Sequence, residues 1–335
     1  MAKIAFFSTQ SYDRRFFENV TDHHQFEFFE TRLKKNTVKL ANGFDGVCVF
    51  VNDRVNREVL KALSEMDVKL VALRCAGFNN VDLKAAEEHG VRVMRVPAYS
   101  PEAVAEHAMA LIMTLARKTH KAYNRVREGN FSLDKLTGFN IHGRTIGVVG
   151  TGKIGQAFIR IAQGFGARVI AYDKYPAKEM EQLGVDYLSF DEVLAYSDIL
   201  SLHCPLTPAT EHLINNESLE KIKKGAMLVN TSRGKLVDTA AVIESLKNDH
   251  LGSLAIDVYE EEEKLFFRDL SELIIRDDTI ARLMLFPNVL ITAHQGFFTN
   301  ESLQEITRTT LKNFEDFEQG RDSENEVSCK LLKNC

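Results

Sequence analysis

The sequence lacks the features that would place the protein in a membrane, in the secretory route or on a nucleic acid. No apolar run approaches the ~18 residues of a membrane span. The N-terminal stretch MAKIAFFSTQ turns polar after four apolar residues, too few for a signal-peptide core. The net charge of −5 comes from intermixed signs, without a long basic block. We therefore expect no membrane association and no nucleic-acid partner.

Cysteine is also scarce, and its positions form no pattern. Cys48, Cys75, Cys204, Cys329 and Cys335 are odd in number and scattered, without the spacing of zinc ligands. This distribution favours free thiols in a reducing cytoplasm and predicts no metal site. The sequence contains no internal repeat and no low-complexity segment, and its apolar content of 44% is that of an ordinary globular protein.

Short β-rich runs alternate with longer helical stretches along the chain, which is typical of α/β folds with parallel sheets. A first series of five runs ends near Val96, and a second series of six begins at Thr145. Six strands with helical connections match a doubly wound sheet. The predicted fold class is α/β, with two Rossmann-like or flavodoxin-like parallel-sheet domains and a cleft between them. The runs are IAFFS, FEFFE, GVCVFV, KLVALRC and VRVMRV, then TIGVVG, RVIAYD, DILSLHCP, MLVNTS, LAIDVY and VLITAH.

Two helices mark the domain boundaries. Ser100-Pro101-Glu102 supplies an N-cap, a first-turn proline and an early acidic residue, so a helix is predicted to start there and to run over 101–117. A last helix keeps apolar spacing from Leu303 to Phe317 and stops at Gly320. It has no further strand to lead into, so we expect it to pack back onto the first domain.

A glycine-rich motif opens the second series of strands. Gly150-Thr151-Gly152-Lys153-Ile154-Gly155 follows the strand TIGVV and leads into a helical run, and Asp173 ends the next strand. In this context the glycines allow a tight turn and a close approach to a pyrophosphate at the helix N-terminus. A carboxylate at Asp173 would accept hydrogen bonds from the adenine ribose and repel a 2′-phosphate, which favours NAD over NADP. The motif makes 101–298 the NAD-binding Rossmann domain and leaves 1–100 plus 299–335 as the substrate-binding (catalytic) domain.

Polar residues follow four of the later strands, at the carboxyl ends where open α/β sheets bind ligands. Hydride transfer to a carbonyl needs a proton donor, a cation for the substrate and a group that keeps the donor charged, and histidine, arginine and glutamate suit these tasks. On spacing alone, either histidine could be the donor, the arginine could pair with a surface carboxylate, and the acidic run at 260–263 could be a solvated face. The residues are His203 and Cys204, Arg233, Asp257 with 260–263, and His294.

Seven stretches resemble the D-isomer-specific 2-hydroxyacid dehydrogenases along nearly the whole chain, in the order of that family. Within the family, the sequence is most similar to the fermentative bacterial enzymes that reduce pyruvate to D-lactate. The stretches are LRCAGFNNVD at 73–82, VPAYSPEAVAEHA at 96–108, VGTGKIGQAF at 149–158, SLHCPLTP at 201–208, VNTSRGKLVD at 229–238, DVYEEE at 257–262 and TAHQGFFT at 292–299.

The resemblance implies roles for three catalytic residues. Arg233 matches the arginine that binds the substrate carboxylate and carbonyl, His294 the general acid/base, and Glu262 its acidic partner. A carboxylate beside His294 favours the imidazolium and keeps a proton available near neutral pH. His203 then falls to a strand end of the cofactor cleft, together with Cys204, Pro205 and Thr231.

The resemblance also implies contacts for the nicotinamide and the substrate. Asp257 matches the position near the nicotinamide carboxamide. The backbone amides of Ala76 and Gly77 would bind the substrate carboxylate, with Tyr99 and Phe298 alongside. Aromatic residues would crowd the substrate side chain, unless they pack in the core, so pyruvate and D-lactate are the expected pair. The five aromatics are Phe50, Phe78, Tyr99, Phe297 and Phe298.

Other functions stay open at this stage. The same residues fit another D-2-hydroxyacid dehydrogenase, of the D-2-hydroxyisocaproate or glyoxylate-reducing kind, acting on a different 2-oxo acid. An NAD-sensing regulatory protein on the same fold is an alternative from another class. The helix at 101–117 resembles the dimer-forming element of the family, so we expect a cytoplasmic homo-oligomer, either a dimer or a tetramer.

Overall fold

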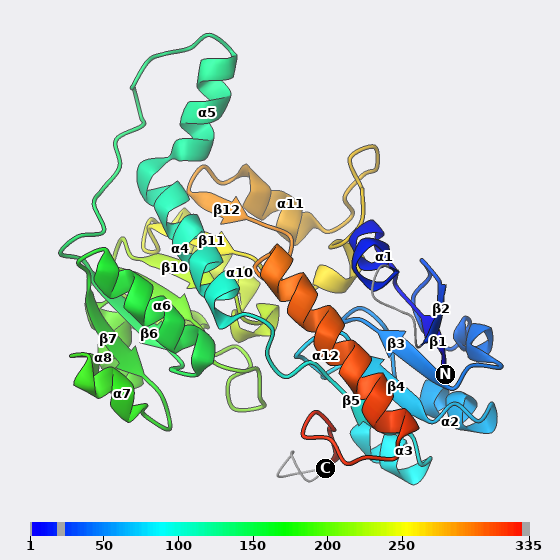
Figure 1. The fold of residues 1–335 in the computed structure, drawn as a ribbon. Coiled ribbons are helices and arrows are strands. Elements are labelled where there is room, and N and C mark those ends of the chain that lie inside the picture. Colours follow the sequence, from blue (N-terminus) through cyan, green and yellow to red (C-terminus); the bar gives the residue numbers. More distant parts are fainter. Residues whose placement is uncertain (1, 19–23, 330–335) are drawn as a thin grey trace. The chain divides into compact units, whose positions relative to one another are not determined.

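The computed structural model describes residues 2–18 and 24–329, and the chain divides into two compact units. Unit 1 combines Met1–Ser100 with Phe298–Cys335, and unit 2 is Pro101–Phe297. Each unit is built on a parallel sheet, one of five strands and one of seven (Figure 1). The prediction of two parallel-sheet α/β domains is therefore confirmed.

Unit 1 carries its five parallel strands in the order β2-β1-β3-β4-β5. The central strands β3 and β4 are buried at every position, which explains their uninterrupted apolar sequences. The strands are β1 (Lys3–Phe6), β2 (Gln25–Phe28), β3 (Gly46–Val49), β4 (Leu70–Leu73) and β5 (Arg92–Met94). The helices are α1 (Ser11–Phe17), α2 (Arg57–Glu65), α3 (Leu83–Glu88) and α12 (Asn300–Glu318), with the 3-10 turn η1 (Val38–Ala41).

The C-terminal helix α12 completes the core of unit 1. Its Phe314 is fully buried in one cluster with Phe6 of β1 and Leu70 of β4. Asn313 of the same helix donates from Nδ2 to the carbonyl of Arg95 at 3.0 Å. Beyond the helix, Glu326 forms an antiparallel bridge with Met94, so the end of the described chain covers the free edge of β5.

A buried ion pair lies at the carboxyl end of β4. Arg74 is 2% exposed, and its Nε and Nη2 each lie 3.2 Å from a carboxylate oxygen of Asp13 on α1. The same guanidinium donates to the carbonyls of Phe7 and Ser8 at 3.0 and 2.8 Å. Arg74 therefore fixes α1 and the segment after β1 to the sheet, and the sequence pattern gave no indication of it.

Unit 2 carries its seven parallel strands in the order β12-β11-β10-β9-β6-β7-β8. The sequence predicted six of them and missed β8, so the predicted count is wrong by one. This strand has only two residues and lies at the sheet edge, where no apolar run is needed. The strands are β6 (Thr145–Val149), β7 (Arg168–Tyr172), β8 (Asp186–Tyr187), β9 (Ile199–Leu202), β10 (Met227–Asn230), β11 (Ser253–Ile256) and β12 (Val289–Ile291).

Two apolar clusters hold helices against the sheet of unit 2. One joins α4 and α6 to the sheet through residues such as Ala108, Ile112 and Phe158, and the other gathers residues of α8, α9 and α10. The helices are α4 (Pro101–Arg117), α5 (Thr119–Arg127), α6 (Lys153–Gly164), α7 (Lys178–Gln182), α8 (Phe190–Tyr196), α9 (Asn216–Lys221), α10 (Thr239–Lys247) and α11 (Asp278–Leu285), with 3-10 turns η2 (Gly234–Leu236) and η3 (Glu262–Lys264).

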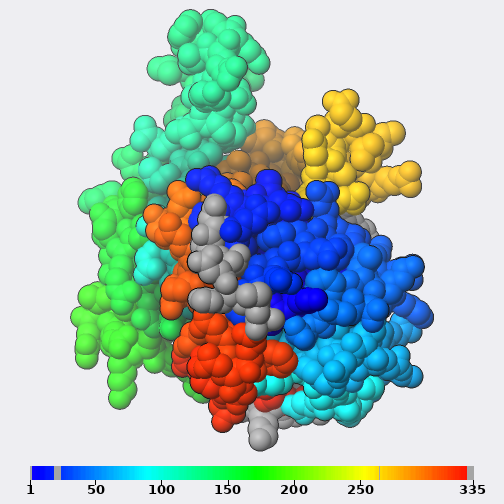
Figure 2. All heavy atoms as spheres, turned by 45° about the vertical axis from the view of Figure 1, so that its right-hand side comes forward, coloured from blue at the N-terminus to red at the C-terminus, as the bar shows by residue number. Residues whose placement is uncertain are grey.

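The segment around α5 extends away from the rest of unit 2, as Figures 1 and 2 both show. Four large apolar side chains there are at least half exposed. They are Tyr123, Val126, Phe131 and Leu133.

The structure also bears on the cysteines and on membrane spans. Cys48, Cys75 and Cys204 form no disulfide, as predicted, and all three are buried. Cys329 is disulfide-bonded, so the prediction of a free thiol is wrong there, because spacing along the chain does not show which sulfur atoms the fold brings together. Cys335 lies outside the described residues. None of the helices that the structure describes has the length and apolarity to cross a bilayer.

The ion pair of unit 1 can be tested by removing one charge. Asp13→Asn keeps the shape of the side chain but removes the carboxylate to which the buried guanidinium of Arg74 is hydrogen-bonded. We expect the free energy of unfolding to fall by about 3–5 kcal/mol. Because the chain has no tryptophan, urea unfolding is best followed by circular dichroism.

Arg57→Ala is the control, because it breaks an exposed ion pair of the same unit, with Glu88. Exposed pairs contribute little, so this variant should unfold like the parent chain. Equal urea midpoints for both variants would show that the buried pair does not hold unit 1 together.

Candidate functional site

The residues that the sequence singled out in unit 2 lie along one edge of its sheet. Because all seven strands are parallel, their carboxyl ends meet at the same edge. Gly150 follows β6, His203 follows β9, Arg233 follows β10 and Asp257 follows β11, while His294 follows the edge strand β12. The chain order reverses between β6 and β9, and such a switch point is where open α/β sheets bind ligands.

His294 and Glu262 form a hydrogen-bonded pair. Nδ1 of His294 lies 2.9 Å from Oε1 of Glu262, and the other carboxylate oxygen accepts the backbone N–H of Tyr259 at 3.0 Å. Both side chains are about one-fifth exposed. With the carboxylate on Nδ1, the proton of a neutral imidazole stays on that nitrogen, and Nε2 is the atom left to give or accept a proton.

The acidic run at 260–263 therefore does not act as one solvated face. Glu262 is hydrogen-bonded to His294. Glu260 instead lies 2.7 Å from Nε2 of His212 and accepts the backbone N–H of Thr239 at 2.9 Å. The same short segment thus supplies the carboxylates of two histidine–carboxylate pairs. Only the pair of His294 follows the edge strand β12 at the carboxyl edge.

Asp257 fixes the segment that carries His294. Its carboxylate accepts the hydroxyl of Thr292 at 2.5 Å and the backbone N–H groups of Gln295 and Gly296 at 2.9 and 2.8 Å. Its backbone carbonyl accepts the N–H of His294 at 2.7 Å. The segment needs such support, because His294 adopts a φ of 54°, which a residue other than glycine rarely takes.

His107 of α4 completes this network. Its Nε2 lies 3.3 Å from Oδ1 of Asp257 and 3.0 Å from the hydroxyl of Thr292. Burial of Asp257 would raise its pKa, but the hydrogen bonds from His107 and Thr292 outweigh burial and hold the pKa below its usual range. Asp257 is therefore a charged, buried anchor. Its predicted contact with the nicotinamide carboxamide stays a prediction.

Arg233 lies at the turn after β10. Asn230, the last strand residue, shapes this turn by donating from Nδ2 to the carbonyl of Arg233 at 2.8 Å. Gly234 then lets the chain pass close to the end of β11, since an added Cβ would lie 2.1 Å from the carbonyl carbon of Tyr259. Within the described residues, the guanidinium forms one hydrogen bond, to the carbonyl of Ser232, and no ion pair. The reading of Arg233 as one half of a surface ion pair is therefore wrong, and a half-buried cation is left at the carboxyl edge.

The glycine motif forms a tight turn before α6. Gly150 has a φ of 97°, and an added Cβ would meet backbone atoms of His203 and Cys204 within 2.7 Å. A Cβ at Gly155 would lie 2.0 Å from the carbonyl oxygen of Gly150. Gly152 differs, because an added Cβ would meet no described atom within 4 Å beyond its own chain neighbours. Gly152 is the N-cap of α6, so the uncapped N–H groups of this helix face open space, beside exposed Lys153 and half-buried Ile154.

Asp173 lies at the end of β7, next to this turn. One carboxylate oxygen accepts the backbone N–H and the hydroxyl of Thr151 at 2.6 and 3.1 Å, and the other accepts the N–H of Tyr175 at 2.8 Å. These bonds hold the carboxylate beside the glycine turn, and the oxygen that accepts from Tyr175 keeps a free lone pair. Asp173 can therefore accept a further hydrogen bond from a ribose hydroxyl.

His203 lies beneath the glycine turn, and its ring centroid is 4.8 Å from that of Phe158. Its Nε2 is 2.9 Å from the hydroxyl of Ser201, and burial lowers its pKa to about 3. The ring is neutral near pH 7, so His203 is a poor proton donor, and His294 is the better of the two histidines for that task. Neighbouring Cys204 is buried, and burial raises its pKa to about 11, whereas Pro205 is exposed.

Thr231 adds a polar group to the same edge. Its hydroxyl is buried and has no hydrogen-bond partner among the described residues. A buried hydroxyl without a partner is unfavourable unless a ligand satisfies it. Together with the open N-terminus of α6 and the carboxylate of Asp173, it fits a dinucleotide carrying a pyrophosphate and a free ribose diol.

The predicted substrate residues of the other domain lie in unit 1. Ala76 and Gly77 follow β4, where their carbonyls accept from Nη1 of Arg95 at 2.8 Å and from the thiol of Cys75 at 3.3 Å. Both are half-buried, as is Tyr99. Phe298 is 48% exposed, and its ring packs edge-on against Tyr12 of α1, with centroids 4.8 Å apart.

Three further members of the group of five aromatics, besides Phe298, have packing contacts of their own. Phe50 is buried under the guanidinium of Arg74, Phe78 lies under that of Arg95, and buried Phe297 lies 6.4 Å from the ring of His294. Among the residues that the sequence did not single out, His107, Thr292 and Tyr12 lie beside predicted site residues. His107 interrupts the apolar face of the helix at 101–117. This interruption was the one signal in the sequence that could have pointed to any of the three residues.

Comparisons with known proteins show the family to which the chain belongs. Residues 109–296 match the family described as D-isomer specific 2-hydroxyacid dehydrogenase, NAD binding domain. A D-lactate dehydrogenase of Escherichia coli (strain K12) is 52% identical over 327 residues, which cover 97% of this chain and 99% of the relative.

Two solved structures are similar over nearly the whole chain. The pyruvate reductase of Chlamydomonas reinhardtii has a TM-score of 0.91 and 46% identity, covering 97% of this chain and 98% of that one. A D-lactate dehydrogenase of Aquifex aeolicus, complexed with NAD and lactic acid, has a TM-score of 0.84 and 34% identity, covering 95% and 96%. The present chain belongs to the D-isomer-specific 2-hydroxyacid dehydrogenase family, and its unit 2 holds the NAD-binding domain of that family.

Proposed function

We propose that the protein reduces pyruvate to D-lactate with NADH, reversibly, and that His294 is the general acid/base. The hydrogen bond between His294 and Glu262 carries this proposal, because it places a histidine with a fixed tautomer at the carboxyl edge of an NAD-binding sheet. The relatives named as D-lactate dehydrogenases and as a pyruvate reductase support the choice of substrate.

The proposed reaction consumes pyruvate, NADH and a proton, and it yields D-lactate and NAD. Bound NADH would supply the hydride for the new C–H bond at the carbonyl carbon. Nε2 of His294 gives a proton to the carbonyl oxygen, so that the C=O bond becomes C–OH. Glu262 stabilises the imidazolium before the transfer and keeps the remaining proton on Nδ1 afterwards. In the reverse direction, the neutral imidazole accepts the hydroxyl proton.

Arg233 would bind the substrate carboxylate. A guanidinium holds two oxygen atoms in one plane, and it also stabilises negative charge as it develops on the carbonyl oxygen. Its single hydrogen bond, to the carbonyl of Ser232, leaves most of its donors available for this purpose. Ala76 and Gly77 would add backbone N–H groups from unit 1.

Asp257 would keep the proton donor in position. It accepts the side-chain hydroxyl of Thr292 before the histidine, the backbone N–H of His294 itself and that of Gln295 after it, and it leaves the imidazole free to interact with Glu262. In this proposal it is a positioning residue for the histidine, whether or not it also contacts the nicotinamide.

The proposal extends to the assembly and to the compartment. The four exposed apolar side chains on and after α5 would be covered by a second copy of the chain in a homo-oligomer. The buried thiols of Cys48 and Cys204 form no disulfide, which fits a reducing cytoplasm, whereas the disulfide at Cys329 does not.

The first test follows NADH consumption with pyruvate and then assigns the chirality of the lactate formed. We expect rapid loss of NADH and D-lactate as the product. Larger 2-oxo acids, such as 2-oxoisocaproate, form the comparison panel, and glyoxylate tests the smaller side. A higher kcat/KM with one of these would shift the substrate assignment within the family. Tight NADH binding without turnover of any of them would favour the regulatory alternative.

The role of the histidine pair can be tested by His294→Ala and Glu262→Gln. Loss of the general acid should lower kcat by roughly 10²–10⁴-fold, while the dissociation constant for NADH stays the same. Glu262→Gln keeps a hydrogen bond but removes the charge, so kcat should fall less than in His294→Ala.

His212→Asn provides the matched control for both variants, because it breaks the other histidine–carboxylate pair of the segment. Its kcat should match that of the parent enzyme. If His294→Ala retained full turnover while His203→Ala lost it, the assignment of the proton donor would be reversed.

The role of Arg233 can be tested by Arg233→Lys, which keeps the charge and removes the planar pair of donors. A lost charge-assisted hydrogen bond costs about 1.5–3 kcal/mol, so kcat/KM for pyruvate should fall roughly 10–100-fold. Steady-state kinetics with varied pyruvate and saturating NADH measures this change, and Lys235→Arg at the exposed neighbouring position is the control. An unchanged kcat/KM in Arg233→Lys would exclude a bidentate contact with the substrate.

A further inference from the structure

Unit 2 contains a pocket of about 530 Å³ that lies away from the carboxyl edge of its sheet. Its walls come from the end of α4, from α5 and the segment after it, and from residues at the start of β11 and just before β12. Because the seven strands are parallel, these starting points lie at the edge opposite to the predicted cofactor residues. The pocket therefore has no part in the proposed reaction.

The lining of this pocket is strongly cationic. Four of the described residues that form it are lysine or arginine and none is acidic, which gives a formal charge of +4 in a chain whose net charge is −5. Nζ of Lys118 donates to the carbonyl of Lys135 at 2.9 Å, and Nζ of Lys121 donates to the carbonyl of Pro287. Nη1 of Arg125 donates to the carbonyl of Asp134 at 2.6 Å. Within the part of the chain that the structure describes, none of the four cations forms an ion pair. They are Lys118, Lys121, Arg125 and Lys135.

These like charges act on one another. The pKa of Lys121 lies below its usual range, because burial and then the charges of Lys118 and Arg125 disfavour the ammonium form. Burial and then the charge of Lys121 lower the pKa of His120, which also lines the pocket. The cations therefore repel one another in the free protein, and an anion between them would turn this repulsion into attraction.

Two of the lysines adopt a backbone conformation that favours glycine. Lys118, which separates α4 from α5, has a φ of 52°, and Lys135 has a φ of 64°. A lysine rarely takes such a φ, and conformations of this kind are found preferentially at ligand sites. The two strained residues meet in one hydrogen bond, from the ammonium of Lys118 to the carbonyl of Lys135, at the wall of the pocket.

The backbone around the cations is held in place. The N–H of Phe139 donates to the carbonyl of Ala116 at 3.1 Å, and a Cβ at Gly138 would lie 2.1 Å from the same carbonyl oxygen. The segment after α5 thus passes directly against the end of α4. On the other wall, Nδ2 of Asn288 donates to the carbonyl of Gly252 at 2.9 Å. A fixed frame of this kind lowers the entropic cost of binding a ligand.

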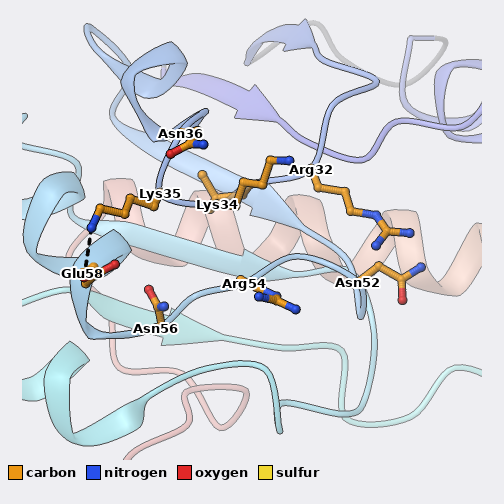
Figure 3. Close-up of a pocket in the computed structure, with 9 residues that line it drawn as sticks. Arg32, Lys34, Lys35, Asn36, Asn52, Arg54, Asn56 and Glu58 are labelled. Atoms are coloured by element: carbon orange, nitrogen blue, oxygen red, sulfur yellow. Dashed lines mark hydrogen bonds and ion pairs between the residues drawn. The ribbon is translucent and has the colours of Figure 1, made fainter. Parts of the chain in front are cut away.

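A second pocket with basic residues, in unit 1, provides a comparison. Its lining includes Lys34 and Lys35 together with an acid, Glu58, whose Oε1 lies 3.2 Å from Nζ of Lys35 (Figure 3). A carboxylate of the protein therefore already offsets part of the charge there. The pocket of unit 2 has no acid in its described lining, which makes it the better site for an external anion.

Charge, size and the other polar groups define the class of ligand. The hydroxyls of Thr137 and Ser253 can donate to anionic oxygen atoms. A charge of +4 exceeds what one phosphate or carboxylate offsets, and the volume lies in the range of small-molecule sites. We infer that the pocket binds a small polyanion, with two or more phosphate or carboxylate groups, which holds α5 against the amino ends of the strands. This inference does not rest on the proposed function.

Binding is tested by isothermal titration at constant ionic strength, with glucose 1,6-bisphosphate, pyrophosphate and tricarballylate as probes. The first two probes carry phosphates and the third carries carboxylates, so they separate the two chemistries. At least one probe should bind the parent protein. Lys121→Ala and Arg125→Ala, both within α5, should each weaken its binding by about tenfold or more, since each removes a charged hydrogen-bond donor. Arg125→Glu, a charge reversal, should abolish binding.

Arg127→Ala is the matched control, because Arg127 is an exposed arginine of the same helix, outside the lining, and donates to the hydroxyl of Tyr123 at 2.9 Å. It removes the same charge as Arg125→Ala, and its affinity for the probe should equal that of the parent. Lys34→Ala is the corresponding control for the pocket of unit 1. Absence of binding by all three probes, or equal affinity in the parent and the variants of Lys121 and Arg125, would overturn the site. Binding that saturating NADH removes and these variants leave intact would place the probe at the glycine turn instead.

The effect on α5 is measured by hydrogen exchange. The bound probe should slow the exchange of backbone amides within 119–139 and leave the peptides around Gly150 and His294 unchanged. Protection around Gly150 alone would contradict the inference. Sedimentation velocity examines the other possible occupant, a second copy of the chain. Loss of self-association in Arg125→Glu, without binding of any probe to the parent, would assign the pocket to a subunit contact and overturn the ligand site.

Discussion

Backbone N–H groups in the loops at the carboxyl edge of a parallel sheet need hydrogen-bond acceptors. In both units a buried aspartate supplies such acceptors. In unit 2, Asp257 binds Gln295 and Gly296 and so fixes the segment that presents His294. In unit 1, the carboxylate of Asp53 accepts the backbone N–H groups of Leu33 and Phe50 and so joins the segments that follow β2 and β3. In each case groups of the protein itself satisfy the hydrogen bonds of the aspartate. It sets the backbone so that neighbouring side chains have a fixed direction from which to act.

The parallel sheets and the position of the candidate residues at the ends of strands could be predicted, because both follow from short-range patterns. Buried parallel strands read as apolar runs, and a chemical group directly after such a run lies at the carboxyl edge. The glycine turn was recognisable for the same reason, since Gly150 and Gly155 exclude side chains through contacts set by the local strand–turn–helix geometry. The two-residue strand β8 carried no such pattern and was missed.

What residue spacing could not give was the choice between chemically equal partners far apart in the chain, and only the resemblance to the family indicated it. Four consecutive glutamates offer no reason to assign Glu262 to His294 and Glu260 to His212, because that choice depends on how β11, β12 and α10 pack. His203 and His294 were likewise equivalent on spacing, and only burial against Phe158 makes His203 a poor proton donor. Arg74 shows the same limit, since its partner Asp13 lies 61 residues away and both are buried in the fold.

Unit 1 is interrupted in the chain by the whole of unit 2, and this has a consequence for biosynthesis. Domains fold as their sequences leave the ribosome, starting from the N-terminus. The first 100 residues emerge without Phe314, which fills their apolar core, and without Glu326, which covers the edge of β5. Unit 2, by contrast, is complete once Phe297 has been made. The nascent chain therefore completes its cofactor domain first. The first 100 residues keep an incomplete apolar core until α12 has been synthesised.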